Sequence, residues 1–223
     1  MTSIVMVCRN RLKLTEQAIN SLRRNTRVAD YNLCLVDDYS TDFRVSKLLR
    51  QAADNNSTTL IRIEKSASVV ARAKNIGVEW SRQTFGEGDW LYISDSDVYF
   101  KEDWLTKLTE YAAYMEPKGY RLWGGQIHPF HDQVEGPSVL DGPSWLMRWK
   151  IWDLYGPFDR LTAPGTCQSE EYPFCTALIE DDYKIEVINP HVVIHTGLTN
   201  TQGDKAPGYE ERKALMEPEV LYE

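Results

Sequence analysis

The sequence Asp89-Trp-Leu-Tyr-Ile-Ser-Asp-Ser-Asp-Val-Tyr-Phe100 carries the strongest structural signal in the chain. Its apolar run, residues 90–93, predicts a short buried strand. Asp95 and Asp97 follow that strand one residue apart, and two such carboxylates repel each other unless positive charge lies between them. A divalent cation that carries a diphosphate would supply this charge, because hard cations take oxygen ligands. A solvated turn that begins a helix is the simpler alternative.

The size and composition of the chain are those of a globular protein. It has 223 residues, of which 42% are hydrophobic and 26% charged, enough for one large domain or two small ones. The net charge of −8 argues against a broad, non-specific grip on nucleic acid. No apolar run is long enough to span a bilayer, and strand-like sequence begins at Ser3. We therefore expect a cytoplasmic protein without a signal peptide, in the host cytoplasm if the chain is viral.

The four cysteines form no Cys-x-x-Cys pair. Cys8 and Cys34 lie in apolar, strand-like runs and are predicted to be small core residues. The spacing of Cys167 and Cys175 matches no zinc pattern. Neither a structural zinc site nor a disulfide framework is expected.

Short strands alternate with amphipathic helices through the first half of the chain. The predicted strands are 4–8, 31–36, 60–63 and 90–93, and the helices between them are 15–24, 45–53 and 70–80. This alternation predicts the α/β class, with a parallel sheet and right-handed crossovers. Ligands of such sheets bind beyond the carboxyl ends of the strands.

Charged residues follow three of these predicted strands. Arg9-Asn-Arg11 follows the first, Asp37-Asp38 the second and Asp95-Ser-Asp97 the fourth. All three segments should face the same crevice at the sheet edge. The sequence therefore predicts a site for a polar ligand that carries phosphate.

Long loops are predicted for the second half, after a helix over 103–115. Gly- and Pro-rich stretches indicate short strands and the variable substrate side of an enzyme. Within the Trp-rich stretch 144–152, Trp145 and Trp149 are candidates to stack on an acceptor, with core packing as the alternative for at least one of them. His128 and His131 are interpreted as acceptor-side or structural residues.

Several motifs of the chain resemble those of family-2-like glycosyltransferases with the GT-A fold. The segments that resemble the family's motifs, in the family's order, are Ser3-Ile-Val-Met-Val-Cys-Arg-Asn-Arg11 (first strand and Asn-Arg turn), Leu35-Val-Asp-Asp-Tyr-Ser-Thr-Asp42 (V-D-D-x-S-T-D), Ala71-Arg-Ala-Lys-Asn-Ile-Gly77 (A-R-x-x-N-x-G), Ile93-Ser-Asp-Ser-Asp97 (D-x-D), Gly156-Pro-Phe-Asp159, Ser169-Glu-Glu171, Tyr183-Lys-Ile185 and Val193-Ile-His195. The resemblance covers residues 3–197.

The resemblance implies the GT-A fold, a Rossmann-like and mostly parallel sheet with flanking helices and a smaller acceptor-side subregion. Residues 1–115 would form the nucleotide-sugar-binding half, 116–200 the acceptor-binding and catalytic half of the same domain, and 201–223 a C-terminal tail or lid. The implied activity is the metal-dependent transfer of a sugar, with inversion, from a nucleoside-diphosphate sugar to an acceptor hydroxyl. A UDP-sugar is the favoured donor, and Mn²⁺ or Mg²⁺ the expected cofactor.

The resemblance also implies roles for residues of the nucleotide half. Val7, Arg9 and Arg11 would line the nucleoside pocket. Asp38 would contact the base, with Asp37 shaping the turn or touching the ribose. Arg72 would reach the base or the phosphates.

Metal ligation and catalysis would fall to later residues. Asp97 would be the principal metal ligand, while Asp95 would contact the ribose or the metal. His195 would complete the metal shell or touch the diphosphate, although a histidine at a strand end is often an ordinary surface residue. The family typically has Glu-Asp where this chain has Glu170-Glu171. Glu171 is the candidate general base with Glu170 in reserve, and an exposed acidic helix start is the alternative.

Two other functions fit parts of the sequence. A sugar nucleotidyltransferase would be expected to have a Gly-rich loop after the first strand, which this chain lacks. A non-catalytic binder of nucleotides or glycans would not need the acidic motifs. The acceptor could be a glycan, a lipid-linked sugar, a protein or a modified DNA base.

Overall fold

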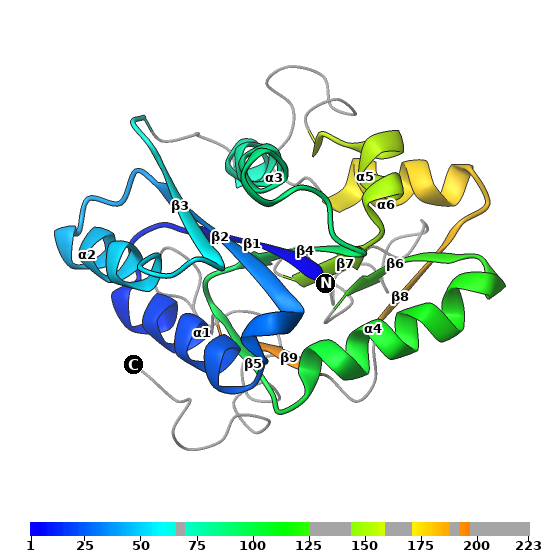
Figure 1. The fold of residues 1–223 in the computed structure, drawn as a ribbon. Coiled ribbons are helices and arrows are strands. Elements are labelled where there is room, and N and C mark those ends of the chain that lie inside the picture. Colours follow the sequence, from blue (N-terminus) through cyan, green and yellow to red (C-terminus); the bar gives the residue numbers. More distant parts are fainter. Residues whose placement is uncertain (66–69, 125–143, 159–170, 188–191, 197–223) are drawn as a thin grey trace.

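The structure is a computed structural model that describes residues 1–65, 70–124, 144–158, 171–187 and 192–196. Its central sheet has seven strands, in the order β3-β2-β1-β4-β7-β6-β8 (Figure 1). They are β1 (Thr2–Cys8), β2 (Tyr31–Asp38), β3 (Thr58–Ile63), β4 (Trp90–Asp95), β6 (Tyr120–Gly124), β7 (Ser144–Met147) and β8 (Lys184–Val187).

The direction of the strands follows the predicted pattern in the first half of the chain. Strands β3, β2, β1 and β4 are parallel neighbours in the sheet, and a helix joins each of the four to the next one along the chain, in the order β1, β2, β3 and β4. Strand β7 runs antiparallel to both β4 and β6, and β8 is parallel to β6. The prediction of an α/β fold with a mostly parallel sheet is therefore confirmed.

Helices cover both faces of the sheet. They are α1 (Leu12–Arg24), α2 (Phe43–Ala52), α3 (Val70–Phe85), α4 (Trp104–Met115), α5 (Trp149–Tyr155) and α6 (Glu171–Glu180), with 3₁₀ turns at Val28–Asp30 and Glu116–Lys118. Figure 1 shows α1, α2 and α4 on one face and α3, α5 and α6 on the other. The fold is thus a three-layer sandwich of helix, sheet and helix.

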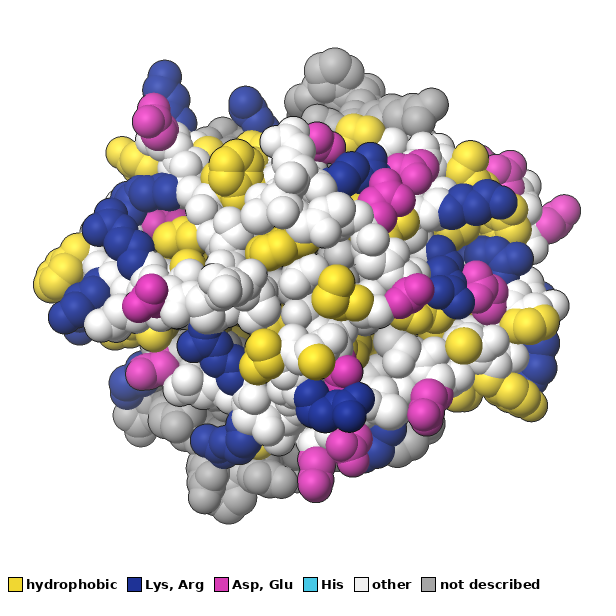
Figure 2. Space-filling model, viewed as in Figure 1, with side chains coloured by type: hydrophobic (Ala, Val, Ile, Leu, Met, Phe, Trp, Pro, Cys, Tyr) yellow, Lys and Arg dark blue, Asp and Glu magenta, His cyan; other side chains and the backbone are white. Residues whose placement is uncertain are grey.

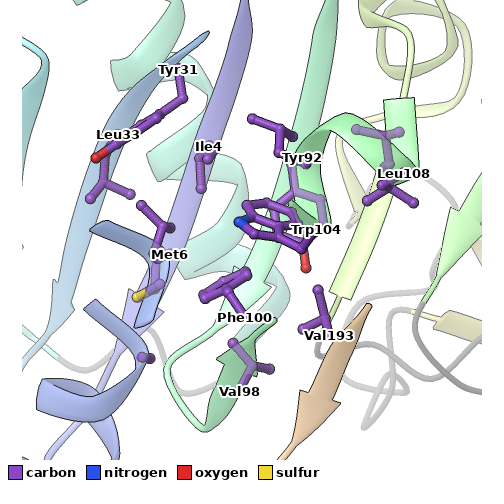
Figure 3. Packing of buried hydrophobic residues seen from close by; sticks show 14 of the residues in the cluster. Ile4, Met6, Tyr31, Leu33, Tyr92, Val98, Phe100, Trp104, Leu108 and Val193 are labelled. Carbon is purple, nitrogen blue, oxygen red and sulfur yellow. The ribbon is translucent and has the colours of Figure 1, made fainter. Parts of the chain in front are cut away.

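Each face of the sheet has its own hydrophobic core, because side chains alternate along a strand. In β1, Ile4 and Met6 pack with α1, α2 and α4, whereas Val5 and Val7 pack with α3. Figure 3 shows the first core, in which the Trp104 ring lies between those of Tyr92 and Phe100. Its ring centroid is 4.8 Å from that of Tyr92 and 4.5 Å from that of Phe100.

A second, two-stranded sheet joins distant parts of the chain. Strand β5 (Val98–Phe100) pairs antiparallel with β9 (Val193–His195), and Val98 lies opposite His195. This pairing brings a late segment of the chain beside the loop that follows β4.

Basic side chains lie along the exposed face of α2. Arg44, Lys47 and Arg50 are exposed along α2, and Figure 2 shows Lys and Arg side chains gathered over this helix. The first 27 residues are also rich in Lys and Arg, so positively charged side chains continue from this segment into α2. Within the part of the chain that the structure describes, no helix has the length and hydrophobicity needed to cross a membrane.

Helix α3 packs closely against the sheet at Gly77. An added Cβ atom there would lie 2.5 Å from Cγ1 of Val5 and 2.5 Å from Cγ2 of Val36. Both valines are fully buried, and β-branched side chains have few alternative rotamers. The last glycine of the A-R-x-x-N-x-G motif is therefore a packing requirement of this sheet–helix contact.

We predict that Gly77→Ala lowers the free energy of unfolding by about 1–3 kcal/mol, because the added methyl overpacks the core. Chemical denaturation followed by circular dichroism measures the change. Gln83→Ala is the matched control on the same helix, since Gln83 is exposed, and it should stay within about 0.5 kcal/mol of the wild type. Equal stability of the two variants would contradict the packing argument.

Candidate active site

The carboxyl ends of β1, β2 and β4 lie side by side, because β1 is the strand between the other two. Cys8 is opposite Asp37 on β2, and Val7 is opposite Asp95 on β4. The three charged segments predicted to share a crevice therefore do meet at one edge of the sheet. Val7 itself is buried within β1, and its predicted contact with the nucleoside stays a prediction.

Asp37 is buried and organises the turn that follows β2. Its carboxylate accepts hydrogen bonds from the backbone N–H of Ser40 at 2.8 Å and the hydroxyl of Ser46 at 2.9 Å. The guanidinium of Arg62, which lies opposite Asp37 on β3, donates to the same carboxylate at 3.1 Å and to the Ser40 carbonyl at 3.1 Å. Asp37 thus shapes the turn, and Arg62 is its cation.

Asp38 and Arg9 occupy the corner predicted to hold the nucleoside. The Asp38 carboxylate is buried, and its Oδ2 atom lies 3.6 Å from Nη1 of Arg9. The Arg9 side chain is half exposed, so its guanidinium lies on the solvent side of the buried Asp38 carboxylate.

Asn10 ties the loop after β1 to the loop after β2. Its backbone N–H donates to the Ser40 hydroxyl at 3.0 Å, and its Oδ1 atom accepts from the N–H groups of Thr41 at 3.0 Å and Asp42 at 3.2 Å. The backbone of Asn10 is left-handed, with φ of 55°. Asparagine tolerates this conformation better than most residues, which explains its place in the turn.

Asp95, at the end of β4, lies close to a lysine of helix α3. The Lys74 Nζ atom lies 3.4 Å from Oδ1 of Asp95, and only 2% of the Lys74 side chain is exposed. Arg72, the residue of this helix expected to reach the base or the phosphates, is exposed, and its predicted role stays a prediction. Two residues correspond to about 200° of rotation on a helix, which explains why Arg72 and Lys74 point in different directions.

Asp97 lies in contact with Arg11. Nη1 of Arg11 donates to Oδ2 of Asp97 at 2.5 Å, and the Asp97 side chain is 11% exposed. The carbonyl of Asp97 accepts a hydrogen bond from the N–H of Thr196 at 2.6 Å. The β5–β9 pairing thereby places the backbone of His195 next to the D-x-D turn, while the His195 side chain lies outside what the structure describes.

The donor set at this turn fits a hard divalent cation. Asp95 and Asp97 supply carboxylate oxygens, and imidazole is a suitable ligand for Mn²⁺. Among the residues that the structure describes, no three His, Cys, Asp or Glu side chains gather closely enough to hold a metal ion. A complete shell at this turn therefore needs a ligand from outside these side chains, such as His195 or the donor's phosphates.

The cysteines near this edge are chemically quiet. Burial, with the negative charges of Asp37 and Asp95, raises the pKa of the Cys8 thiol far above its ordinary range. Burial also raises the pKa of Cys34 to about 12. Both thiols are protonated at neutral pH, in agreement with their predicted role as core residues.

The candidate base begins helix α6. Glu171 is the first residue of that helix, whereas Glu170 lies outside the described residues. Helix α6 precedes β8 by a short turn, and β8 runs in the same direction as β6 and β4. The helix is ten residues and about 15 Å long, so it begins toward the carboxyl edge of the sheet and ends near the start of β8.

The two tryptophans suggested as acceptor contacts are core residues. Trp145 is 1% exposed and packs against the rings of Phe158 and Phe174, with centroid distances of 5.5 and 5.4 Å. Trp149 is 4% exposed and lies under the guanidinium of Arg82. Neither position supports an acceptor platform, and core packing, the stated alternative, describes both. His128 lies outside the described residues.

Sequence reasoning missed two residues that the structure brings to this edge, namely Arg62 and Lys74. A signal existed for Lys74, because its spacing from Ala71 and Val78 places it on the buried face of the helix. Arg62 is a charged residue within the strand β3, which predicts an acidic partner, but the sequence does not show which acidic residue that partner is.

Comparison with known proteins identifies the family. The family model described as glycosyl transferase family 2 matches residues 3–120, more than half of the chain. No curated protein matches the chain in sequence.

Solved structures share the fold at low sequence identity. The mannosyltransferase PcManGT from Pyrobaculum calidifontis, in complex with GDP-Man and Mn²⁺, has a TM-score of 0.69 and 13% identity over 96% of this chain and 60% of its own. S. aureus TarS 1-349 with UDP-GlcNAc has a TM-score of 0.58 and 15% identity over 96% of this chain and 64% of its own. GalNAc-T7 with UDP, GalNAc and Mn²⁺ has a TM-score of 0.64 and 14% identity over 87% of this chain and 43% of its own.

The present chain thus spans less than two thirds of the length of each of these proteins. The shared architecture is the GT-A fold, as the resemblance implied. With its sheet order, its acidic turns and the family match, this chain belongs to glycosyl transferase family 2.

Proposed function

We propose that this chain is a metal-dependent glycosyltransferase that moves a hexosyl or pentosyl group from a nucleoside-diphosphate sugar to an acceptor hydroxyl. The observation that carries the proposal is the meeting of acidic and basic side chains at the carboxyl edge of β1, β2 and β4. Asp38 with Arg9 forms one end of this charged surface, and Asp97 with Arg11 the other. A nucleoside diphosphate has a base and ribose at one end and a negatively charged diphosphate at the other, which matches this arrangement.

The donor would lie along the edge with its base at Asp38. A buried carboxylate can accept hydrogen bonds from N–H groups of a base, and Asp95 would contact the ribose or the metal. Exposed Arg72 is available to the phosphates from the start of α3. UDP is bound in the GalNAc-T7 structure and UDP-GlcNAc in that of TarS, whereas PcManGT holds GDP-Man. We favour a UDP-sugar for this chain.

Asp97, with His195 and Asp95, would hold Mn²⁺ or Mg²⁺. Bound there, the cation would compensate the charge that the departing nucleoside diphosphate gains. Mn²⁺ is present in the PcManGT and GalNAc-T7 structures, which supports a divalent cofactor for this chain.

Glu171 would act as the general base of an inverting displacement. Its carboxylate takes the proton of the acceptor hydroxyl while the oxygen forms its bond to the anomeric carbon. The bond from that carbon to the diphosphate breaks at the same time, and the nucleoside diphosphate leaves with the electron pair. The start of α6 at the carboxyl edge supports this role, and Glu170 is the neighbouring alternative.

The acceptor would be a glycan, a lipid-linked sugar, a protein or a modified DNA base, in the cytoplasm. A sugar nucleotidyltransferase is disfavoured because the chain belongs to a glycosyltransferase family. Thermal-shift screening of nucleotide sugars with Mn²⁺ or Mg²⁺ tests the proposal. A donor at a hundred times its Kd stabilises the folded state by about 2.7 kcal/mol, so the correct donor raises the Tm. No rise with any nucleotide sugar would contradict the proposal.

We predict that Asp97→Asn lowers metal-dependent donor hydrolysis by roughly two to three powers of ten, because the principal metal ligand is lost. Hydrolysis with water as the acceptor is measured by release of nucleoside diphosphate. Asp182→Asn is the matched control, since Asp182 is exposed in the turn before β8. Retained Mn²⁺-dependent turnover in Asp97→Asn would place the metal elsewhere.

We predict that Glu171→Gln still binds the donor but turns it over about two to four powers of ten more slowly, because the amide cannot accept the proton. The donor-induced Tm shift measures binding, and nucleoside diphosphate release measures turnover. Glu170→Gln is the adjacent control and should keep most activity. The reverse pattern would assign the base to Glu170, and full activity of both variants would rule out this mechanism.

A further inference from the structure

Both carboxylates of the D-x-D turn contact a cation from the chain itself. Lys74 approaches Asp95 at 3.4 Å, and Arg11 donates to Asp97 at 2.5 Å. These cations offset the repulsion between two acidic side chains that stand one residue apart. The chain thus supplies, from its own residues, positive charge where a metal would otherwise bind.

The two cations differ in their freedom to move. Lys74 projects from α3 into the protein and its side chain is 2% exposed, so burial restricts its movement. Arg11 lies in the loop between β1 and α1, and 36% of its side chain is exposed. Of these two, Arg11 is therefore the cation that can leave its carboxylate.

The backbone of Arg11 is held in an unusual conformation. Its φ of 51° and ψ of 53° are left-handed, directly after the left-handed Asn10. Such conformations are unfavourable for arginine and persist where the surroundings require them. The carbonyl of Arg11 accepts the N–H of Thr15 at 3.0 Å, so the first turn of α1 fixes the backbone and leaves the side chain to reorient.

A metal ion and a guanidinium compete for the same carboxylate. A divalent cation on Asp97 would stand within a few ångströms of the Arg11 charge, and like charges at that distance repel strongly. A diphosphate offers the guanidinium a better partner, because planar guanidinium groups bind phosphate oxygens with paired hydrogen bonds. The same event that brings the donor therefore provides a new position for Arg11.

We propose that Arg11 is a positioning residue that exchanges between Asp97 and the donor's diphosphate, so that the guanidinium and the divalent cation exclude each other at Asp97. This inference rests on the proposed function, which places the metal at Asp97. It requires that the donor-free protein binds metal weakly, and that donor and metal assist each other's binding by reciprocal coupling.

The test measures Mn²⁺ binding in the absence of any nucleotide, by electron paramagnetic resonance of the free ion. Arg11→Gln removes the competing charge and should raise Mn²⁺ affinity. We expect a gain of roughly ten-fold, a typical size for the effect of one site on the affinity of a coupled site. The same variant should bind UDP more weakly than the wild type in the presence of EDTA, because a phosphate partner is lost. The two affinities therefore move in opposite directions.

Two further variants separate this effect from a general loss of positive charge or of fold. Arg27→Gln is the matched control, since Arg27 is exposed and pairs with Asp30, and it should leave Mn²⁺ affinity unchanged. Arg11→Asn is a second neutral variant that suits the left-handed backbone, so it keeps the test valid if Arg11→Gln does not fold.

The outcomes distinguish the inference from the function on which it rests. If Asp97→Asn abolishes Mn²⁺ binding while the folded neutral Arg11 variant binds Mn²⁺ no better than the wild type, the exchange is wrong and the metal site stands. If Asp97→Asn binds Mn²⁺ as the wild type does, the metal site itself is wrong. A gain in the neutral Arg11 variant that disappears when Asp97→Asn is added confirms the exchange.

Discussion

The parallel pairing of β1 with both β2 and β4 is the constraint on which the site depends. It aligns three strand ends, so that loops far apart in the sequence share one edge. The alternation of side chains along β1 then anchors a helical layer on each face. Because Gly77 lets α3 pack closely against Val5 and Val36, the helix that carries Lys74 comes within reach of Asp95. Packing in the core and charge at the edge are therefore parts of one arrangement.

At this edge, each of four carboxylates has a basic partner from another segment. Asp37 pairs with Arg62, Asp38 with Arg9, Asp95 with Lys74 and Asp97 with Arg11. Lys74 is enclosed, whereas the side chains of Arg9, Arg11 and Arg62 are 51%, 36% and 40% exposed. Arg62 also donates to the Ser40 carbonyl and so holds the turn after β2, which leaves Arg9 and Arg11 as the arginines that we propose a phosphate-bearing ligand recruits.

Much of this arrangement could be predicted from the sequence. Periodicity and the acidic strand ends were sufficient for the α/β class, the parallel sheet and the shared edge, since these depend on local pattern and general topology. The antiparallel β7 and the burial of Trp145 and Trp149 were not predictable in the same way. A tryptophan suits a core or a sugar platform equally well, and contacts with Phe158 and Phe174 decide between them. The roles of Glu171 and His195 stay predictions.

The pairing of β5 with β9 has a consequence for biogenesis. Val98 and His195 are about a hundred residues apart, and contacts between such distant segments form late because closing a long loop costs entropy. The strands that present Asp38 and Asp95 lie entirely within the first half of the chain. On the ribosome, the strand ends that carry these carboxylates can consequently pair before β9 emerges, whereas the pairing that brings the backbone of His195 beside the D-x-D turn has to wait for β9. The proposed metal site, which includes His195, would therefore be completed only after β9 has joined β5.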